Sequence, residues 1–203
     1  MDVFVSLFNV IVMSVKTINF ETYKESFTVS SDRKENYGEI LTPFSIVREM
    51  ITYIPLHIRL NRNVKYIDPA CGTGHFPMVL FNHLRELWTQ NAQTCDPVST
   101  KESIEEYILE NSLFLCELNS IHRENLEQLF GSKANILIGN FLTMTRHSIL
   151  GDKCEASTRI CIIGNPPYNS GGFVKVPTNT SLNKKNDGVA LWREFIRHSI
   201  SIM

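Results

Sequence analysis

The alternation of short apolar runs with longer amphipathic segments constrains the fold of this chain more than any other sequence feature. The apolar runs are VKYID (64–68), LFLCE (113–117), ANILIG (134–139) and RICIIG (159–164). The segments between them have the spacing of amphipathic helices over about 76–90, 103–111 and 120–130. Because strands that alternate with helices form a mostly parallel, doubly wound sheet, we predict an α/β fold.

A further helix is predicted just before the first of these strands. Thr42 and Pro43 match an N-cap followed by a proline at the first helical position. The apolar residues after them keep helical spacing as far as Pro55, which is expected to end the helix. Another start signal is the sequence STKE at 99–102, which has the spacing of a capping box ahead of the helix predicted over 103–111.

The N-terminal part of the chain differs in composition from the rest. A polar, turn-rich segment at 30–38 follows an apolar piece, so we predict that residues 1–36 form an extension and linker and that the folded domain begins at 37. The apolar run at 3–15 is shorter than the ~20 residues that span a bilayer. It also lacks the basic region and the small-residue cleavage site of a signal peptide. We therefore expect it to pack as a helix or strand, and we expect no membrane contact.

Cysteine content and charge exclude several classes of protein. The five cysteines are odd in number, widely spaced and free of any CxxC pattern, which argues against a disulfide framework and against a zinc site. We expect no metal site, and we expect a cytoplasmic or other reducing intracellular location, not secretion. The formal net charge of −1 gives no overall basic signature, so contact with nucleic acid requires a local patch. The basic residues near the C-terminus are either a phosphate-contacting surface or a solvated loop: Lys175, Lys184, Lys185, Arg193 and Arg197.

Each predicted strand is followed by an unusual cluster of polar or turn-forming residues. The clusters are DPACGTG (68–74), ELN (117–119), NF (140–141) and NPPY (165–168). The carboxyl ends of parallel strands meet at one edge of a sheet, and ligands of doubly wound folds bind there. We therefore predict one site, built from all four clusters.

The first two clusters indicate a nucleoside-type cofactor. DPACGTG is a glycine turn between a strand and a helix, but it is neither GxGxxG nor a P-loop, because no Lys-Ser/Thr follows its last glycine. Two glycines alone also occur in plain tight turns. Asp68 closes the first strand, and Glu117 closes the second, where a carboxylate can bind a ribose diol or simply be solvated. Their separation exceeds the ~20 residues typical of dinucleotide folds, which predicts a helical insertion over about 88–110 and disfavours a nicotinamide cofactor.

Other residues allow more than one interpretation. Asn140 and Phe141 offer an amide and an aromatic face to an adenine ring, or they are an asparagine turn and a core phenylalanine. For His75, His83 and Cys71 we expect packing or turn roles, because no carboxylate partner or ligand spacing supports nucleophilic or metal chemistry. The tryptophans, Trp88 and Trp192, are expected in the core.

The order of these motifs resembles that of a known family. YGEILTPFSIVREM, DPACGTGHF, CELN, GNFL and GNPPY are similar to motifs X, I, II, III and IV of the gamma class of DNA adenine-N6 methyltransferases of restriction-modification systems, which use S-adenosylmethionine. The resemblance covers about 37–168 and extends to LWREFIRHSI, which resembles the helix of motif V. NPPY also occurs in glutamine-N5 methyltransferases and some ribosomal RNA methyltransferases, but motif X and DPACGTG favour the DNA enzymes.

The resemblance implies a set of cofactor-binding residues. Thr42 and its neighbours would cover the methionine end of the cofactor, Glu117 would hold the ribose hydroxyls, and Phe141 would be the stacking residue. Asn140 replaces the usual aspartate and still accepts through its carbonyl oxygen, so cofactor binding is expected to be somewhat weaker. The implied cofactor-binding set is Tyr37, Thr42, Pro43, Asp68, Pro69, Ala70, Cys71, Gly72, Gly74, Phe76, Glu117, Leu118, Asn140 and Phe141.

The implied catalytic residues are Asn165, Pro166, Pro167 and Tyr168. The N6 amine of adenine is a poor nucleophile because its lone pair is delocalised into the ring. Two acceptors, the side-chain oxygen of Asn165 and the carbonyl of Pro166, would favour the pyramidal amine and stabilise the charge that develops on it. Proline rigidity fixes where these acceptors point. Tyr168 would stack on an adenine that has left the duplex.

The chain is short for this family, whose fold is Rossmann-like and has seven strands. Only 35 residues follow Tyr168 (203 − 168), so we expect 37–203 to be a partial catalytic domain, incomplete on its C-terminal side and without a target recognition domain. The chain is then a fragment, a degenerate relative, or a subunit completed by a partner chain. Two alternative functions follow: a catalytically silent cofactor-binding module, and a protein glutamine-N5 methyltransferase. The expected partners are DNA and a second chain that supplies the missing strands.

Overall fold

The computed structural model describes residues 42–91, 103–167 and 191–203. Several predicted features lie outside these ranges and are not placed by the structure. They are the apolar run at 3–15, the loop at 30–38, the capping box at 99–102, Tyr37, Tyr168, Lys175, Lys184 and Lys185. In the described part of the chain, no helix is long and apolar enough to cross a membrane.

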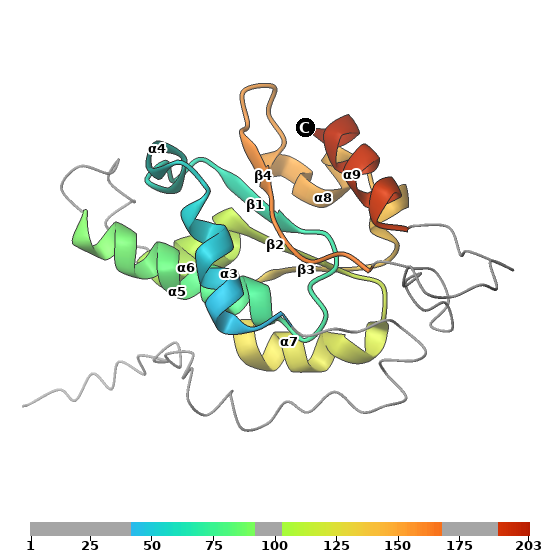
Figure 1. Cartoon of the computed structure of the whole chain (residues 1–203), viewed down its shortest axis with the longest axis horizontal. Coiled ribbons are helices and arrows are strands. Elements are labelled where there is room, and N and C mark those ends of the chain that lie inside the picture. The colour runs from blue at the N-terminus through green and yellow to red at the C-terminus, as the bar shows by residue number, and fades with distance from the viewer. Residues whose placement is uncertain (1–41, 92–102, 168–190) are drawn as a thin grey trace, which may run out of the picture.

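The centre of the fold is a parallel sheet with the strand order β3-β2-β1-β4 (Figure 1). The strands are β1 (Lys65–Asp68), β2 (Leu113–Glu117), β3 (Asn135–Ile138) and β4 (Ile160–Ile162). Each strand lies within the apolar run predicted for it, so the predicted α/β fold and the parallel sheet are confirmed. The order reverses between β1 and β4, which is the switch point where doubly wound sheets bind ligands.

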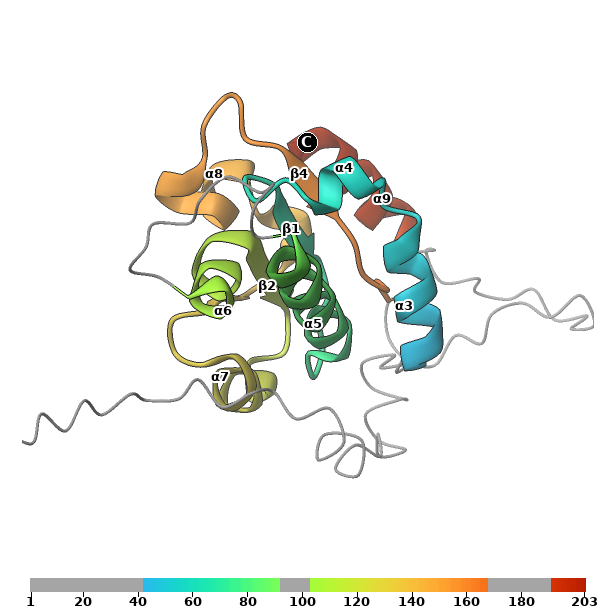
Figure 2. The ribbon, with the colours of Figure 1, turned by 90° about the vertical axis from the view of Figure 1, so that its left-hand side faces the viewer.

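Helices cover both faces of this sheet (Figure 2). Alternate residues of β1 and β2 point to opposite faces, so Tyr66 and Leu115 join one core while Ile67 and Phe114 join the other. The first core contains residues of α3 (Phe44–Thr52), α5 (His75–Gln90) and α7 (Arg123–Phe130). The second contains residues of α8 (Arg146–Leu150) and α9 (Leu191–Ile202). Burial on both faces explains why β2 is an apolar run as far as Glu117 and does not alternate with polar residues. Strand β1 is buried along its whole length too, although Lys65 and Asp68 stand at its two ends.

Helix α3 begins and ends differently from the prediction. Pro43, not Thr42, occupies the N-cap position, and no side chain caps the helix. The helix ends at Thr52 with Tyr53 as its C-cap, three residues before Pro55, whose ring disfavours the helical conformation at Ile54. Pro55 is instead the N-cap of the short helix α4 (Leu56–Arg59). The hydroxyl of Thr42 is used elsewhere, as described below.

The segment before β2 is also less regular than predicted. The helix predicted over 103–111 consists of α6 (Ile104–Tyr107) and a π-helical turn, η1 (Ile108–Ser112), which runs directly into β2. A capping box starts α6, in which Ser103 Oγ accepts from the Glu106 N–H at 3.1 Å and Glu106 Oε2 accepts from the Ser103 N–H.

The segment predicted over 120–130, after β2, is a 3₁₀ turn, η2 (Ser120–His122), followed by α7.

Helix α9 packs on the sheet through one face only. Phe195 and Ile202 are buried, and Arg146 of α8 donates to the terminal carbonyl of Met203 at 2.6 Å. The expectation that both tryptophans are in the core is half correct. Trp88 is fully buried, whereas Trp192 of α9 is 38% exposed. Two more 3₁₀ turns, η3 (Phe141–Thr143) and η4 (Gly151–Lys153), flank α8.

Candidate active site

A cavity of about 260 Å³ lies at the carboxyl edge of the sheet, and every one of the four predicted clusters contributes to its wall. Of the predicted site residues, those lining it are Thr42, Asp68, Pro69, Ala70, Cys71, Gly72, Phe76, Glu117, Leu118, Asn140, Phe141, Asn165, Pro166 and Pro167. Pro43 and Gly74 lie next to the cavity in the chain but do not line it. The sheet topology therefore brings together residues that are up to 125 positions apart in sequence (Thr42 to Pro167, 167 − 42).

One backbone hydrogen bond ties the glycine turn after β1 to β2. The Cys71 N–H donates to the Cys116 carbonyl at 2.9 Å. Gly72 has a φ of +54°, which a residue with a side chain rarely adopts. Gly74 has a different constraint, because a Cβ on it would lie 2.8 Å from the ring of Phe130 on α7. Gly72 thus shapes the cavity wall, whereas Gly74 allows α5 to approach α7.

The Glu117 carboxylate connects the turn after β1 to the loop after β2. Its Oε2 accepts from the Gly72 N–H and its Oε1 accepts from the Asn119 N–H, both at 2.8 Å. The residue is buried, with 8% of its surface exposed. Each oxygen keeps a second lone pair that a ligand can use. Glu117 is therefore fixed in position before any ligand binds.

Asp68 has one satisfied and one unsatisfied oxygen. Its Oδ1 accepts from the Ala70 N–H at 3.1 Å. Its Oδ2 is buried and has no partner among the described residues, and Asp68 is one of the residues that line the cavity. Burial, opposed by the Ala70 hydrogen bond and reinforced by the negative charge of Glu117, raises the pKa of Asp68 to about 7. A buried oxygen without a partner is costly, so this atom marks where a ligand donor or cation fits.

Asn165 is tied to the start of α3. Its Nδ2 donates to Thr42 Oγ1 at 3.0 Å, across 123 positions of sequence. Its Oδ1 accepts no hydrogen bond from the described part of the chain, and the residue lines the cavity. Pro166 and Pro167 follow on the same wall. The cavity therefore contains an amide oxygen that is available to a donor.

Asn140 forms an asparagine turn and Phe141 packs in the core, which is one of the two interpretations that their sequence allows. Asn140 is exposed, and its Oδ1 caps η3 by accepting from the Leu142 N–H at 3.1 Å. Phe141 is buried and stacks on Phe195 of α9, with ring centroids 5.7 Å apart. Both residues still line the cavity, so their roles toward a cofactor stay predictions.

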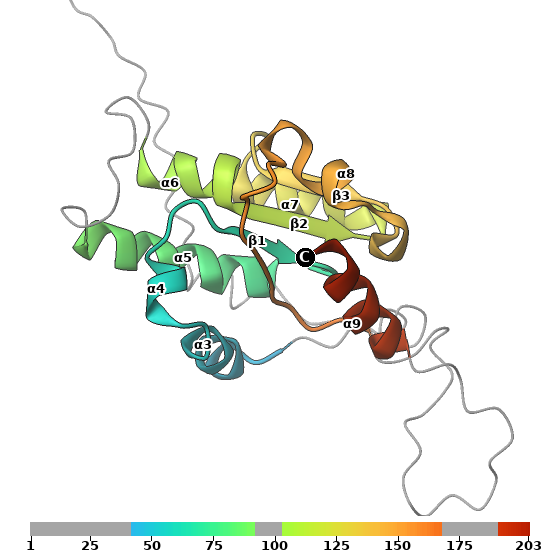
Figure 3. The same ribbon diagram turned by 90° about the horizontal axis from the view of Figure 1, so that it is seen from above.

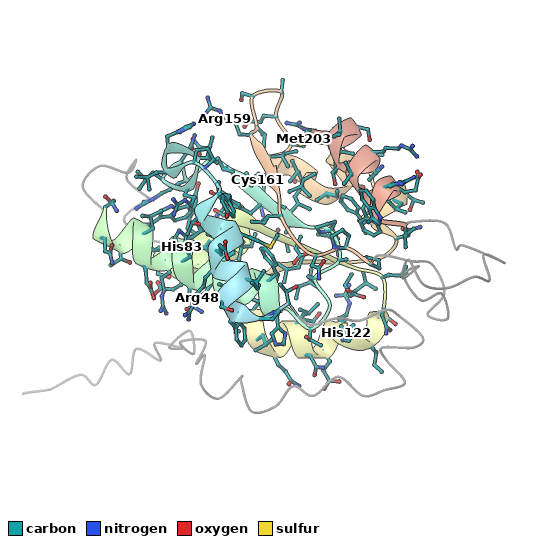
Figure 4. The ribbon with its side chains drawn as sticks, in the orientation of Figure 1. Arg48, His83, His122, Arg159, Cys161 and Met203 are labelled. Atoms are coloured by element: carbon teal, nitrogen blue, oxygen red, sulfur yellow. The ribbon has the colours of Figure 1, made fainter. Side chains whose placement is uncertain are left out.

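The histidines and Cys71 have the packing contacts that were expected. His75 stacks on Phe44 at 5.1 Å, and burial lowers its pKa to about 4, so the imidazole is neutral at physiological pH. Burial raises the pKa of Cys71 well above the usual thiol range, which disfavours a thiolate nucleophile. His83 lies on α5 away from the cavity, with its Nε2 2.9 Å from Arg59 Nη1 (Figure 4).

Several residues of the cavity wall were not named individually as site residues in the sequence analysis, although Thr73 and Asn119 belong to its clusters. They are Thr73, His75, Asn119, Gly139, Leu142, Leu191 and Phe195. Most are neighbours of predicted residues in the same loops. Leu191 and Phe195 come from α9, and the similarity of LWREFIRHSI to a family motif was the signal that indicated this helix. The roles of individual aromatic residues on α9 required the three-dimensional structure.

A sequence model of the N-6 DNA methylase family matches residues 21–197. No curated protein sequence matches the chain. Among solved structures, the DrdV–DNA complex is similar at 20% identity with a TM-score of 0.50, over 83% of this chain and 19% of that chain. At this identity the likeness concerns the fold.

Two further structures are similar over a smaller part of the chain. The type IIL restriction-modification enzyme MmeI in complex with DNA is 18% identical with a TM-score of 0.47, over 70% of this chain and 24% of that chain. A modification subunit of a putative type I restriction enzyme from Vibrio vulnificus is 24% identical with a TM-score of 0.41, over 68% of this chain and 26% of that chain. The chain thus spans about a quarter or less of the length of these structures.

Proposed function

The chain belongs to the N-6 DNA methylase family, and from this premise we propose that it forms the catalytic part of a DNA methyltransferase that transfers a methyl group from S-adenosylmethionine to N6 of adenine. The observation that carries the proposal is the position of Asn165. Asn165, whose amide oxygen accepts no hydrogen bond from the described residues, lines the same cavity as Asp68 and Glu117. An acceptor for the target amine and acceptors for a cofactor are therefore side by side.

The residues of the cavity fit S-adenosylmethionine by their chemistry. Glu117 has unused lone pairs that suit the two ribose hydroxyls. Asp68 Oδ2, buried and without a partner among the described residues, suits the positive charge of the cofactor. Leu118 is 67% exposed at the rim, and an apolar side chain at that position suits the face of an adenine ring. When bound, the cofactor supplies a methyl group on a cationic sulfur that is already activated for transfer.

The NPP segment can serve the target amine without a strong base. Asn165 Oδ1 and the Pro166 carbonyl are two acceptors for the two N–H bonds of the amine, and they favour a lone pair directed at the methyl group. The positive charge that develops on N6 is stabilised by the same two oxygens, and N6 then releases one proton to solvent. Because the methyl donor is activated, positioning and electrostatics account for most of the expected rate enhancement.

We also propose partners and a location. The target is adenine in DNA, turned out of the duplex so that its amine reaches the cavity, with Tyr168 stacking on it. A second chain, or a further part of a longer protein, supplies sequence recognition and the remaining strands. We place this activity in a reducing intracellular compartment.

The test is methyl transfer to DNA that lacks N6-methyladenine. The chain is incubated with methyl-labelled S-adenosylmethionine and this DNA, and the nucleosides are analysed by mass spectrometry. Label is expected in N6-methyladenine, and Asn165→Ala is expected to abolish it. Asn63→Ala is the matched control, because Asn63 is exposed just before β1 at the opposite edge of the sheet. Label on protein or RNA in place of DNA would overturn the proposal, and cofactor binding without transfer would favour a silent module.

A further inference from the structure

The chain entering α3 and the chain leaving β4 approach each other at the cavity (Figure 3). The contact between them is the hydrogen bond from Asn165 Nδ2 to Thr42 Oγ1. Thr42 is half-buried and does not cap α3, although its position in the sequence predicts that it does. Its hydroxyl is therefore assigned to the catalytic loop and the cavity, not to its own helix.

The chemistry of this hydrogen bond determines which end of the amide faces the target. An amide has an acceptor end and a donor end, and a threonine hydroxyl can bond either one. With Nδ2 donating to Thr42, the oxygen of Asn165 is turned away from Thr42 and is available to the target amine. In the reverse orientation the hydroxyl would donate to Oδ1, and the amide NH₂ would then face the N–H bonds of the target, donor against donor.

Which of the two orientations the Asn165 amide adopts therefore depends on where the Thr42 hydroxyl donates its hydrogen. No atom of the described residues accepts this hydrogen, and Thr42 lines the cavity. An acceptor within the cavity would commit the hydrogen and leave only the lone pairs of Oγ1 for Asn165. S-adenosylmethionine carries such an acceptor, the carboxylate of its methionine portion, and hydrogen bonds to carboxylates are among the stronger ones.

We propose that Thr42 is a positioning residue shared by cofactor and target: its hydroxyl donates to the cofactor carboxylate and accepts from Asn165. Cofactor binding thereby fixes the catalytic amide with its oxygen toward the target amine. Because coupling is reciprocal, Asn165 in turn strengthens cofactor binding through Thr42. This inference rests on the proposed function, since it requires that the chain binds S-adenosylmethionine.

Two local features make Thr42 suitable for this role. A β-branched side chain has few χ1 rotamers, so the hydroxyl oxygen has few positions available to it. Pro43 follows it, and the residue before a proline is held in an extended backbone conformation. The Oγ1 of Thr42 is thus placed with little loss of conformational entropy when the cofactor binds.

The test measures the affinity for S-adenosylhomocysteine by isothermal titration calorimetry, which requires no catalysis. Thr42→Val is expected to weaken binding by about tenfold, as for a lost hydrogen bond to a charged group. Asn165→Ala is expected to weaken it by about threefold, and the double variant is expected to be no weaker than Thr42→Val. Thr42→Ser keeps the hydroxyl and is expected to stay within about threefold of wild type.

Two controls separate this mechanism from a loss of structure. Thr52→Val makes the same change at the other end of α3, where the hydroxyl bonds the Glu49 carbonyl, and should leave the affinity unchanged. An analogue of S-adenosylhomocysteine that lacks the carboxylate should bind wild type and Thr42→Val equally. Thermal unfolding without ligand reports whether each variant is folded. The affinity of wild type for the analogue tests the carboxylate contact without any substitution in the protein.

Several results would overturn the inference. One is that Thr42→Val and Asn165→Ala weaken S-adenosylhomocysteine binding by factors that multiply in the double variant. Another is that Asn165→Ala leaves this affinity unchanged. The third is that Thr42→Ser binds S-adenosylhomocysteine as weakly as Thr42→Val does. The outcome is distinguishable from failure of the proposed function. Coupled binding without N6-methyladenine in DNA would support the shared hydroxyl and contradict the activity, whereas methylation without coupling would do the opposite. A wild-type protein that binds no S-adenosylhomocysteine would overturn both.

Discussion

Gly164 lies directly against the carboxylate of Asp68. A Cβ built on Gly164 would be 2.5 Å from Asp68 Oδ1 and 3.0 Å from its Cγ. Gly164 immediately precedes Asn165, and Asp68 is the last residue of β1. The absence of a side chain at 164 therefore allows the segment that leads to Asn165 to leave β4 in contact with the acidic end of β1.

Gly164→Ala is expected to damage both stability and the cavity. The new methyl group overlaps a buried carboxylate that cannot move without breaking its bond to the Ala70 N–H. We expect the free energy of unfolding to fall by roughly 1–3 kcal/mol, as for other overpacked sites, and S-adenosylhomocysteine binding to weaken. Urea denaturation and calorimetry measure the two effects.

The control for this substitution is Gly131→Ala. Gly131 has open space around it but a φ of +83°, so alanine there is strained by its backbone conformation alone. It should lose stability and keep its ligand affinity. Equal losses of affinity in the two variants would contradict the contact described here.

Asp68 is expected to make stability depend on pH. Its pKa of about 7 in the folded protein lies above the value of about 3.9 for an unfolded chain. The folded state therefore binds the proton more tightly, and the stabilisation from this group, present at low pH, is lost as the pH rises through about 7. Between pH 5 and pH 8, the unfolding free energy of wild type should fall by roughly 2 kcal/mol relative to that of Asp68→Asn. Parallel pH profiles for the two proteins would contradict this.

The sheet and the position of the site follow from short-range sequence patterns. Strand β2 is covered on both faces, and its sequence LFLCE is accordingly apolar as far as Glu117. In β1 only the central Tyr66 and Ile67 carry this signal. Once four parallel strands are identified, the residues after each one must lie at the same edge. This is why Glu117 and Asn165 could be assigned to one site before the structure was known.

The predictions from sequence that were wrong or left open concern contacts between residues far apart in sequence. Thr42 has the local pattern of an N-cap, but its hydroxyl bonds Asn165 on another loop. Helix α9 has apolar residues on two sides, and its sequence does not tell which side meets the sheet, so Trp192 was wrongly expected in the core. Phe141 shows the same limit, because an aromatic residue after a strand suits either a ligand or a neighbouring helix. In each case tertiary packing decides between options that local sequence leaves equal.

Glu117→Gln is expected to disrupt the cavity despite its similar size. Both carboxylate oxygens accept from backbone N–H groups, those of Gly72 and Asn119, so an amide NH₂ would oppose one donor with another. We expect a loss of roughly 1–3 kcal/mol in unfolding free energy and at least about tenfold weaker S-adenosylhomocysteine binding. Glu127→Gln is the matched control, because that carboxylate is in an exposed pair with Arg123 and should change stability by less than about 1 kcal/mol. A Glu117→Gln protein with normal stability and affinity would show that these bonds are not needed.

The two aromatic residues on α9 are expected to respond differently to truncation. Phe195 is buried against Phe141 and lines the cavity, whereas Trp192 on the same helix is 38% exposed. Phe195→Ala should lower the unfolding free energy by roughly 3 kcal/mol, and Trp192→Ala should lower it by less than about 1 kcal/mol. Phe195→Leu keeps most of the packing but removes the aromatic face, so a selective loss of S-adenosylhomocysteine affinity in this variant would indicate contact with the adenine ring. A Trp192→Ala protein as unstable as Phe195→Ala would contradict the packing of α9 through a single face.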